Sequence, residues 1–91
     1  MIGDIPPPPA IYDHEFGGRV HVRRLSSIEV DKLCRFYGAK GTGEVVACAL
    51  RLGEDFCIMV LPQIGVGGIA QRTYDLIVRH ETGHCNGWRH D

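Results

Sequence analysis

The sequence predicts a small α+β domain in which a sheet of about three strands, antiparallel or mixed, packs with two main helices. Residues 19–24 alternate between apolar and polar side chains, as a strand does. Two apolar, β-branched-rich runs, at 44–52 and 55–61, are separated by a Gly-Glu pair that suits a hairpin turn. Apolar residues recur at helical spacing in two further segments, 26–37 and 68–85. A chain of 91 residues is long enough for one such domain with a modest core.

Local signals set the expected ends of these elements. The first helix is expected to begin at Ser26, whose hydroxyl can form a capping box with Glu29, and to end at Gly38. The glycine-rich loop at 38–43 lacks the spacing of a phosphate-binding loop, so we treat it as a plain connection. Residues 57–61 are almost continuously apolar, which predicts a strand covered on both faces or paired with a partner strand.

The chain divides into an N-terminal arm, residues 1–18, and a single folded domain, residues 19–91. Four consecutive prolines at 6–9 favour an extended polyproline II conformation in the arm. The favoured interpretation is a flexible leader or one draped over the surface, because chain termini usually behave in this way. The alternative is a strap laid across a groove or a neighbouring chain.

Charge and composition exclude two classes of partner. A net charge of −1 and a pI near 6.5 argue against a nucleic-acid surface. No apolar run approaches the roughly 20 residues of a membrane span, so no membrane partner is expected.

The cysteine pattern and the N-terminus predict a cytoplasmic location. Residues 1–10 lack the basic start and apolar stretch of a secretory signal, which weakens the disulfide interpretation that an even number of cysteines invites. We therefore expect reduced thiols, with Cys34, Cys48 and Cys57 as small core residues. No two cysteines have C-x-x-C spacing, so a cysteine-based zinc knuckle is not expected.

The last twelve residues form the pattern H-E-x-x-H-x-x-G-x-x-H-D, whose first part lies on the second predicted helix. His80 and His84 are one helical turn apart, so both imidazoles can reach one zinc ion. Glu81 points to the side of this pair, which suits a general base rather than a ligand. Gly87 can end the helix and turn the chain so that His90 becomes the third ligand. Three protein ligands leave zinc an open position, as in catalytic sites.

These residues resemble the zinc signature of the metzincin clan of metallopeptidases, and the core H-E-x-G-H-C-N-G-W resembles small bacterial and phage-type proteins. The resemblance covers the last fifth of the chain. It implies a hydrolase acting on a peptide or protein substrate, in which His80, His84 and His90 bind Zn²⁺ and Glu81 activates the zinc-bound water. Clan members continue after the third histidine, whereas this sequence stops at Asp91. We therefore expect the lower wall of the cleft to be missing, supplied by another chain or removed. Asp91 or its terminal carboxylate is a substitute oxygen ligand.

Two other functions compete with peptide hydrolysis. In the first, zinc joins the helix to the C-terminal tail of a non-catalytic regulatory or interaction module, because a small core benefits from such a staple. In the second, a zymogen-like or oligomeric form places Asp13, His14 or Glu15 of the arm in the open zinc position. For the peptidase itself, residues 57–61 are the candidate upper rim of the cleft, where an extended substrate would add as a strand.

Overall fold

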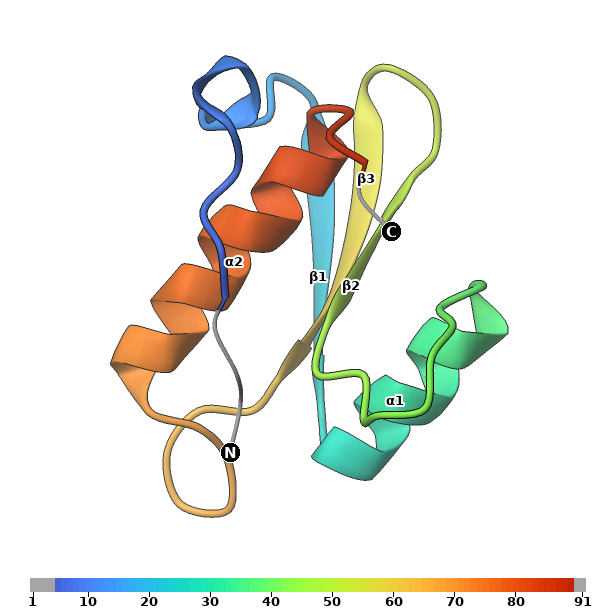
Figure 1. Cartoon of the computed structure of the whole chain (residues 1–91), viewed down its shortest axis with the longest axis vertical. Helices are drawn as coiled ribbons and strands as arrows, with labels where there is room; N and C mark the ends of the chain where they lie inside the picture. Colours follow the sequence, from blue (N-terminus) through green and yellow to red (C-terminus); the bar gives the residue numbers. More distant parts are fainter. Residues whose placement is uncertain (1–4, 90–91) are drawn as a thin grey trace.

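The computed structural model describes residues 5–89 and confirms the predicted α+β fold (Figure 1). In chain order the elements are the 3-10 turn η1 (Ala10–Tyr12), β1 (Arg19–Leu25), α1 (Ser27–Phe36), β2 (Cys48–Arg51), β3 (Phe56–Pro62) and α2 (Gln71–Cys85). The three strands form one mixed sheet in the order β1-β3-β2, with β3 parallel to β1 and antiparallel to β2. Between residues 5 and 89, neither helix combines the length and the apolar character needed to cross a bilayer.

The central strand β3 is covered on both faces, as its apolar sequence predicts. Cys57, Met59 and Leu61 belong to a core cluster with α2, whereas Val60 packs with α1 on the opposite face. Its backbone pairs with β1 on one side and β2 on the other. The prediction that this strand forms the free rim of a cleft is therefore wrong, because the edge next to α2 belongs to β2, with which α2 is in extensive contact.

The first helix begins where its capping signal predicts. The Ser26 hydroxyl accepts a hydrogen bond from the Glu29 amide, and the Glu29 carboxylate accepts one from the Ser26 amide. These reciprocal bonds satisfy amide groups that have no partner within the helix. The helix ends at Phe36, and Gly38 adopts a φ of +112°, which a residue with a side chain rarely adopts.

The second helix starts three residues later than its sequence pattern predicts. The segment before it returns to the end of β3, where the Ile69 amide donates to the Gln63 carbonyl at 2.9 Å. Gly68 lies so close to this carbonyl that an added Cβ would be 2.1 Å from its oxygen. The backbone of residues 63–69 is thus committed to a closed loop, and α2 begins only at Gln71.

The helical spacing of residues 68–85 predicts a core stripe that includes Leu76 and Ile77, but the buried stripe of α2 is rotated from it. Tyr74, Ile77, Glu81 and Cys85 are buried and face the sheet, whereas Leu76, which the helical pattern places on the core side, is 44% exposed. The stripe follows the i, i+3, i+4 spacing of an amphipathic helix. It carries Glu81 into the protein interior, and this placement governs the chemistry described below.

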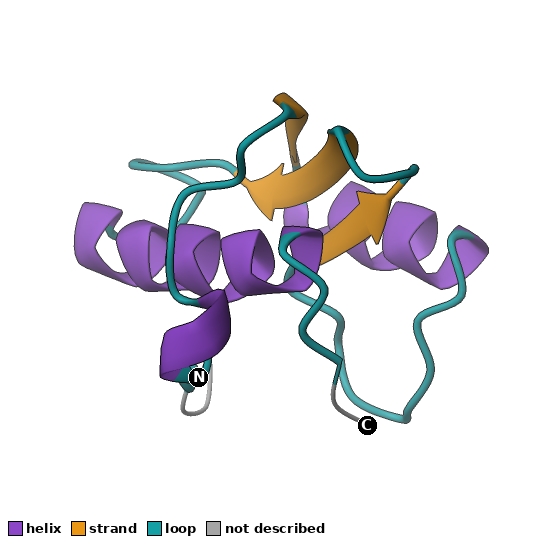
Figure 2. Cartoon of the chain, turned by 90° about the horizontal axis from the view of Figure 1, so that it is seen from above, coloured by secondary structure: helices purple, strands orange, loops and turns teal. Residues whose placement is uncertain are grey.

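The arm lies on the side of α2 that faces away from the strands (Figures 1 and 2). Arg79 of α2 donates to the carboxylate of Asp13 in the arm. The Asn86 side-chain amide donates to the backbone carbonyls of Tyr12 at 2.9 Å and His14 at 2.6 Å. The described part of the arm is therefore draped over the surface and attached there by side chains of the C-terminal half of α2 and its cap.

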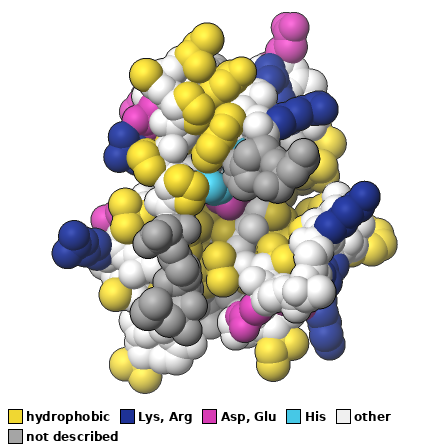
Figure 3. All heavy atoms as spheres, in the orientation of Figure 1, with side chains coloured by type: hydrophobic (Ala, Val, Ile, Leu, Met, Phe, Trp, Pro, Cys, Tyr) yellow, Lys and Arg dark blue, Asp and Glu magenta, His cyan; other side chains and the backbone are white. Residues whose placement is uncertain are grey.

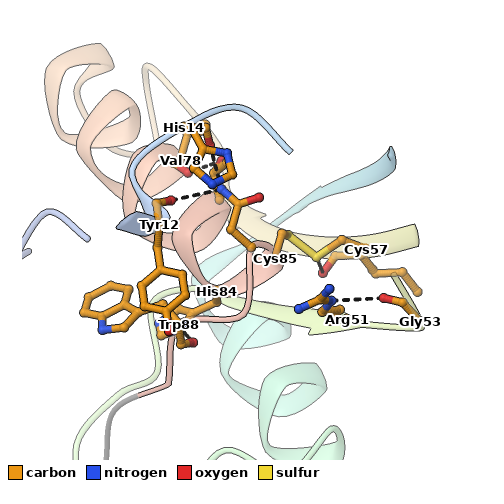
Figure 4. The surroundings of a disulfide bond; sticks show 12 residues. Tyr12, His14, Arg51, Gly53, Cys57, Val78, His84, Cys85 and Trp88 are labelled. Carbon is orange, nitrogen blue, oxygen red and sulfur yellow. Dashed lines mark hydrogen bonds between the residues drawn. A yellow bond between two sulfur atoms is a disulfide. The ribbon is translucent and has the colours of Figure 1, made fainter. Parts of the chain in front are cut away.

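The prediction of reduced thiols is wrong, because all four cysteines form disulfides. Cys34 of α1 bonds to Cys48 of β2, and Cys57 of β3 bonds to Cys85 at the end of α2 (Figure 4). The predicted burial of Cys34 and Cys57 is confirmed, since neither is exposed to solvent. Packing brings the partners to Cα–Cα distances of 5.8 and 5.7 Å, which suit a disulfide. Spacing along the chain carried no signal for this pairing.

The Cys57–Cys85 bond should contribute most to stability, because it closes the longer loop. Its partners are 28 residues apart, against 14 for Cys34 and Cys48. Replacing both members of the longer pair by Ala should lower the free energy of unfolding by about 3–4 kcal/mol, and the same change in the shorter pair by about 3 kcal/mol. Urea unfolding under non-reducing conditions measures both. Free thiols in the wild-type protein, detected after unfolding without a reductant, would contradict the pairing.

Candidate metal centre

His80 and His84 of α2 turn their rings toward each other, as their spacing predicts. Their Nε2 atoms are 3.2 Å apart, and the ring centroids are 4.9 Å apart with an angle of 72° between the planes. Both side chains are half-buried. Two nitrogen ligands at the usual zinc distance and a tetrahedral angle are about 3.3–3.4 Å apart. The pair therefore has the separation that a shared zinc ion requires.

Each ring is oriented by a backbone carbonyl on the side away from the other ring. His80 Nδ1 lies 2.8 Å from the carbonyl oxygen of Pro6, and His84 Nδ1 lies 2.7 Å from that of Trp88. Because a carbonyl oxygen only accepts hydrogen bonds, each Nδ1 carries the proton and donates it. In the neutral rings the lone pairs then belong to the two facing Nε2 atoms. Histidine ligands of metals are usually held in this way by an outer hydrogen bond.

A glycine turn brings the chain back over His84. Gly87 has a φ of +106°, its amide donates to the His84 carbonyl, and the Trp88 amide donates to the Gly83 carbonyl, both at 3.0 Å. This pair of bonds is the Schellman motif that ends many helices. The Trp88 ring stacks on the His84 ring with centroids 4.7 Å apart and planes 7° apart, and the two residues lie beside the Cys57–Cys85 bond (Figure 4). The turn at Gly87 thus places Trp88 so that its ring stacks on the His84 ring and its carbonyl oxygen accepts from His84 Nδ1.

Glu81 lies inside the protein, next to the histidine pair. Its side chain is only 7% exposed. Burial raises the pKa of this carboxyl group to about 7, because the ionised form loses its hydration. A group with a pKa near neutrality can both take up and release a proton at the pH of most cells. The sequence placed Glu81 beside the ligand pair, and the structure places it further inward.

The three motif residues open into one hollow of about 350 Å³. Its other walls are small or apolar residues of α1, β2 and the loop between them: Cys34, Tyr37, Ala39, Ala47, Cys48 and Ala49. Figure 3 shows a histidine side chain next to an acidic one near the centre of the face in view. The site is therefore bounded by the edge strand of the sheet on one side and by α2 on the other.

The other predicted ligands lie outside the described residues. This applies to His90, the third ligand, and to Asp91, its substitute. Within residues 5–89, no group of three or more His, Cys, Asp or Glu side chains is arranged to hold a metal ion. His80 and His84 are thus the described part of the expected ligand set.

The arm carboxylates and His14 do not reach this hollow. Asp13, His14 and Glu15 line a separate hollow of about 270 Å³ together with Arg79 and Thr82. Asp13 is bonded to Arg79, and Arg79 holds the pKa of this carboxyl group below its usual value. The described arrangement therefore gives no support to a zymogen-like form in which these side chains occupy the open zinc position of the same chain.

No family model, curated protein or solved structure matches the chain. The site is therefore assigned from its own geometry. Two contributors were missed at the sequence level, the carbonyl oxygens of Pro6 and Trp88. Trp88 follows His84 by four residues, so its role is a local consequence of the Gly87 turn. For Pro6, which is 74 residues from His80, the sequence carries no signal.

In the metal-free protein, Glu81 should lower stability as the pH rises. Its pKa is about 7 in the folded state and near the ordinary 4.5 when unfolded, so the folded protein binds the proton more tightly. The free energy of unfolding should therefore fall between pH 4.5 and 7 and stay low above pH 7. Glu81→Gln should remove this loss, which is at most about 3 kcal/mol at pH 8. Urea unfolding in the presence of a chelator, at pH 5 and pH 8, measures it.

The matched control is Glu54→Gln, an exposed loop residue that should leave the pH dependence of the wild type intact. An equally steep profile in Glu81→Gln would show that another group causes it.

Proposed function

We propose that this protein is a zinc-dependent, metzincin-like peptidase in which His80, His84 and His90 hold the metal and Glu81 is the general base. The observation that carries the proposal is the facing pair of Nε2 atoms, 3.2 Å apart, with a buried carboxyl group in the same hollow. The donor set also fits, because imidazole nitrogens held through Nδ1 are typical zinc ligands.

The chain's own residues account for the proton transfers of the reaction. Bound zinc would supply Lewis acidity, which polarises a carbonyl group and acidifies water. Glu81 accepts a proton from the attacking water and later donates it to the leaving amine. Burial raises the pKa of Glu81 to about 7, and a metal cation nearby would lower this pKa and so favour the ionised, basic form.

The substrate is best placed along β2. This strand is at the edge of the sheet, and residues 47–49 line the hollow that contains the histidine pair. An extended peptide can add to such an edge through main-chain hydrogen bonds. The role that the sequence suggested for the apolar strand at residues 57–61 thus passes to its neighbour.

A purely structural role for zinc is the weaker candidate. A small core gains from a metal staple, but here two disulfides already cross-link α1 to β2 and β3 to α2. A buried carboxyl group beside the ligand pair also adds to the cost of folding without helping a structural site.

The disulfides also bear on where the protein works. We propose an oxidising environment, because disulfides persist outside the cytoplasm and are rare within it. The cytoplasmic location expected from the sequence came from the lack of a secretory signal in residues 1–10 and implied reduced thiols, whereas the four cysteines are paired.

Replacing the base should separate binding from catalysis. Glu81→Gln keeps the size of the side chain but cannot take up a proton, so peptide cleavage should fall at least 100-fold while zinc stays bound. Zinc content and cleavage of a broad peptide library measure the two effects, with Glu54→Gln as the exposed control. Wild-type cleavage by Glu81→Gln would exclude the mechanism. A zinc-loaded wild type that cuts no peptide would favour the interaction module.

The third ligand can be tested by a substitution and by a deletion. His90→Ala should weaken zinc binding by more than the 10- to 100-fold typical of losing an outer-shell partner. Deletion of His90 and Asp91 should weaken it further if the Asp91 carboxylate substitutes as a ligand. Competition with a chelating dye gives both affinities. Unchanged affinity in both variants would remove His90 from the site.

A further inference from the structure

We propose that the N-terminal arm is a positioning element of the metal centre, with the main-chain carbonyl of Pro6 orienting His80. This inference rests on zinc binding by His80 and His84, as proposed above, and does not depend on catalysis. It assigns a role to the proline run, which the peptidase mechanism leaves unexplained.

The chemistry of a proline run suits this role. Polyproline II has no internal hydrogen bonds, so its carbonyl oxygens are available to other donors. Proline has no amide hydrogen that could compete for an acceptor. The Pro6 carbonyl accepts from His80 Nδ1 at 2.8 Å, which leaves Nε2 as the nitrogen that faces His84. An arm in this conformation therefore offers a stiff acceptor at the outer edge of the ring.

The arm is seated by a notch in α2. Pro8 is buried against Gly83, and a Cβ added at Gly83 would lie 2.5 Å from the Pro8 ring. Only glycine leaves this space open. Glycine in the middle of a helix costs about 1 kcal/mol relative to alanine, so its presence here has a packing reason. The notch lies one helical turn from His80 and fixes where the Pro6 carbonyl falls.

Two clamps further along the arm hold its register. Arg79, which precedes His80, donates to Asp13, and the Asn86 side chain donates to the carbonyls of Tyr12 and His14. The clamping residues are about two helical turns apart on α2, and the histidine pair and the notch lie between them. The arm therefore docks along the whole ligand-bearing part of the helix.

The Trp88 ring packs against both histidine rings, but the hydrogen bonds that orient their Nδ1 atoms come from different parts of the chain. His84 is oriented by Trp88, four residues away, through the turn that ends its own helix. His80 is oriented by a segment 74 residues away, which must first dock. Arm docking and metal binding are therefore coupled, and by linkage each should strengthen the other.

Detaching the arm from α2 should weaken zinc binding. It should remove the Nδ1 hydrogen bond of His80 and leave that of His84 in place. Pro8→Gly removes the buried ring and loosens the arm without touching α2, so zinc affinity should fall 10- to 100-fold. Pro9→Gly loosens the backbone at an exposed position on the other side of Pro8 from the Pro6 carbonyl, and should bind zinc as the wild type does. Gly83→Ala fills the notch from the helix side and should also weaken binding, although alanine favours the helix. Competition with a chelating dye measures each affinity.

The ¹⁵N spectra of the histidine rings at pH 8 show whether the arm orients His80 or only contributes to the stability of the fold. In the wild type, both His80 and His84 should carry the proton on Nδ1. In Pro8→Gly, His80 should lose this pattern while His84 keeps it. Unchanged affinity in Pro8→Gly, or ring spectra that change together or not at all, would overturn the inference.

The same spectra distinguish failure of this inference from failure of the proposed function. A wild type that binds no zinc would end the zinc proposal. In that case the metal-free protein still tests the arm. An Nδ1 proton on His80 that is present in the wild type and lost in Pro8→Gly supports positioning by the arm, and identical His80 spectra overturn it.

Discussion

The packing of α2 against the central strand β3 is the constraint on which the rest of the structure depends. Tyr74 and Ile77 of the helix meet the buried side chains of β3, and the Cys57–Cys85 bond closes the contact at the helix end. Once the helix is held in this rotation, its other faces have fixed directions. Glu81 faces inward, the histidine pair opens toward the hollow beside β2, and the outer side is left for the arm.

The same packing places opposed chemical demands on the site. Burial disfavours the charged form of Glu81, and the Nε2 atoms of His80 and His84 face each other across 3.2 Å. A divalent cation held by both rings, as proposed above, would accept a lone pair from each and would stabilise a nearby carboxylate.

Features encoded within a few residues were predicted well from the sequence. The Ser26–Glu29 capping box, the turn at Gly87 and the convergence of His80 and His84 all follow from spacing, because each involves groups within about one helical turn. Features that depend on distant segments were not. The disulfide pairing and the central place of β3 were both missed. Spacing along the chain does not reveal which segments of a folded chain become neighbours.

The sequence by itself determined the chemistry available to this protein: two imidazoles and a carboxyl group on one helix, with a glycine to turn the chain behind them. The tertiary structure alone decided how that chemistry is set. It buried Glu81 and so moved its pKa, and it chose the Pro6 carbonyl as the partner of His80. The physical reason is the distance along the chain over which each effect acts. Helix spacing and capping act between near neighbours, whereas burial and the docking of the arm are created only when distant parts of the chain pack together.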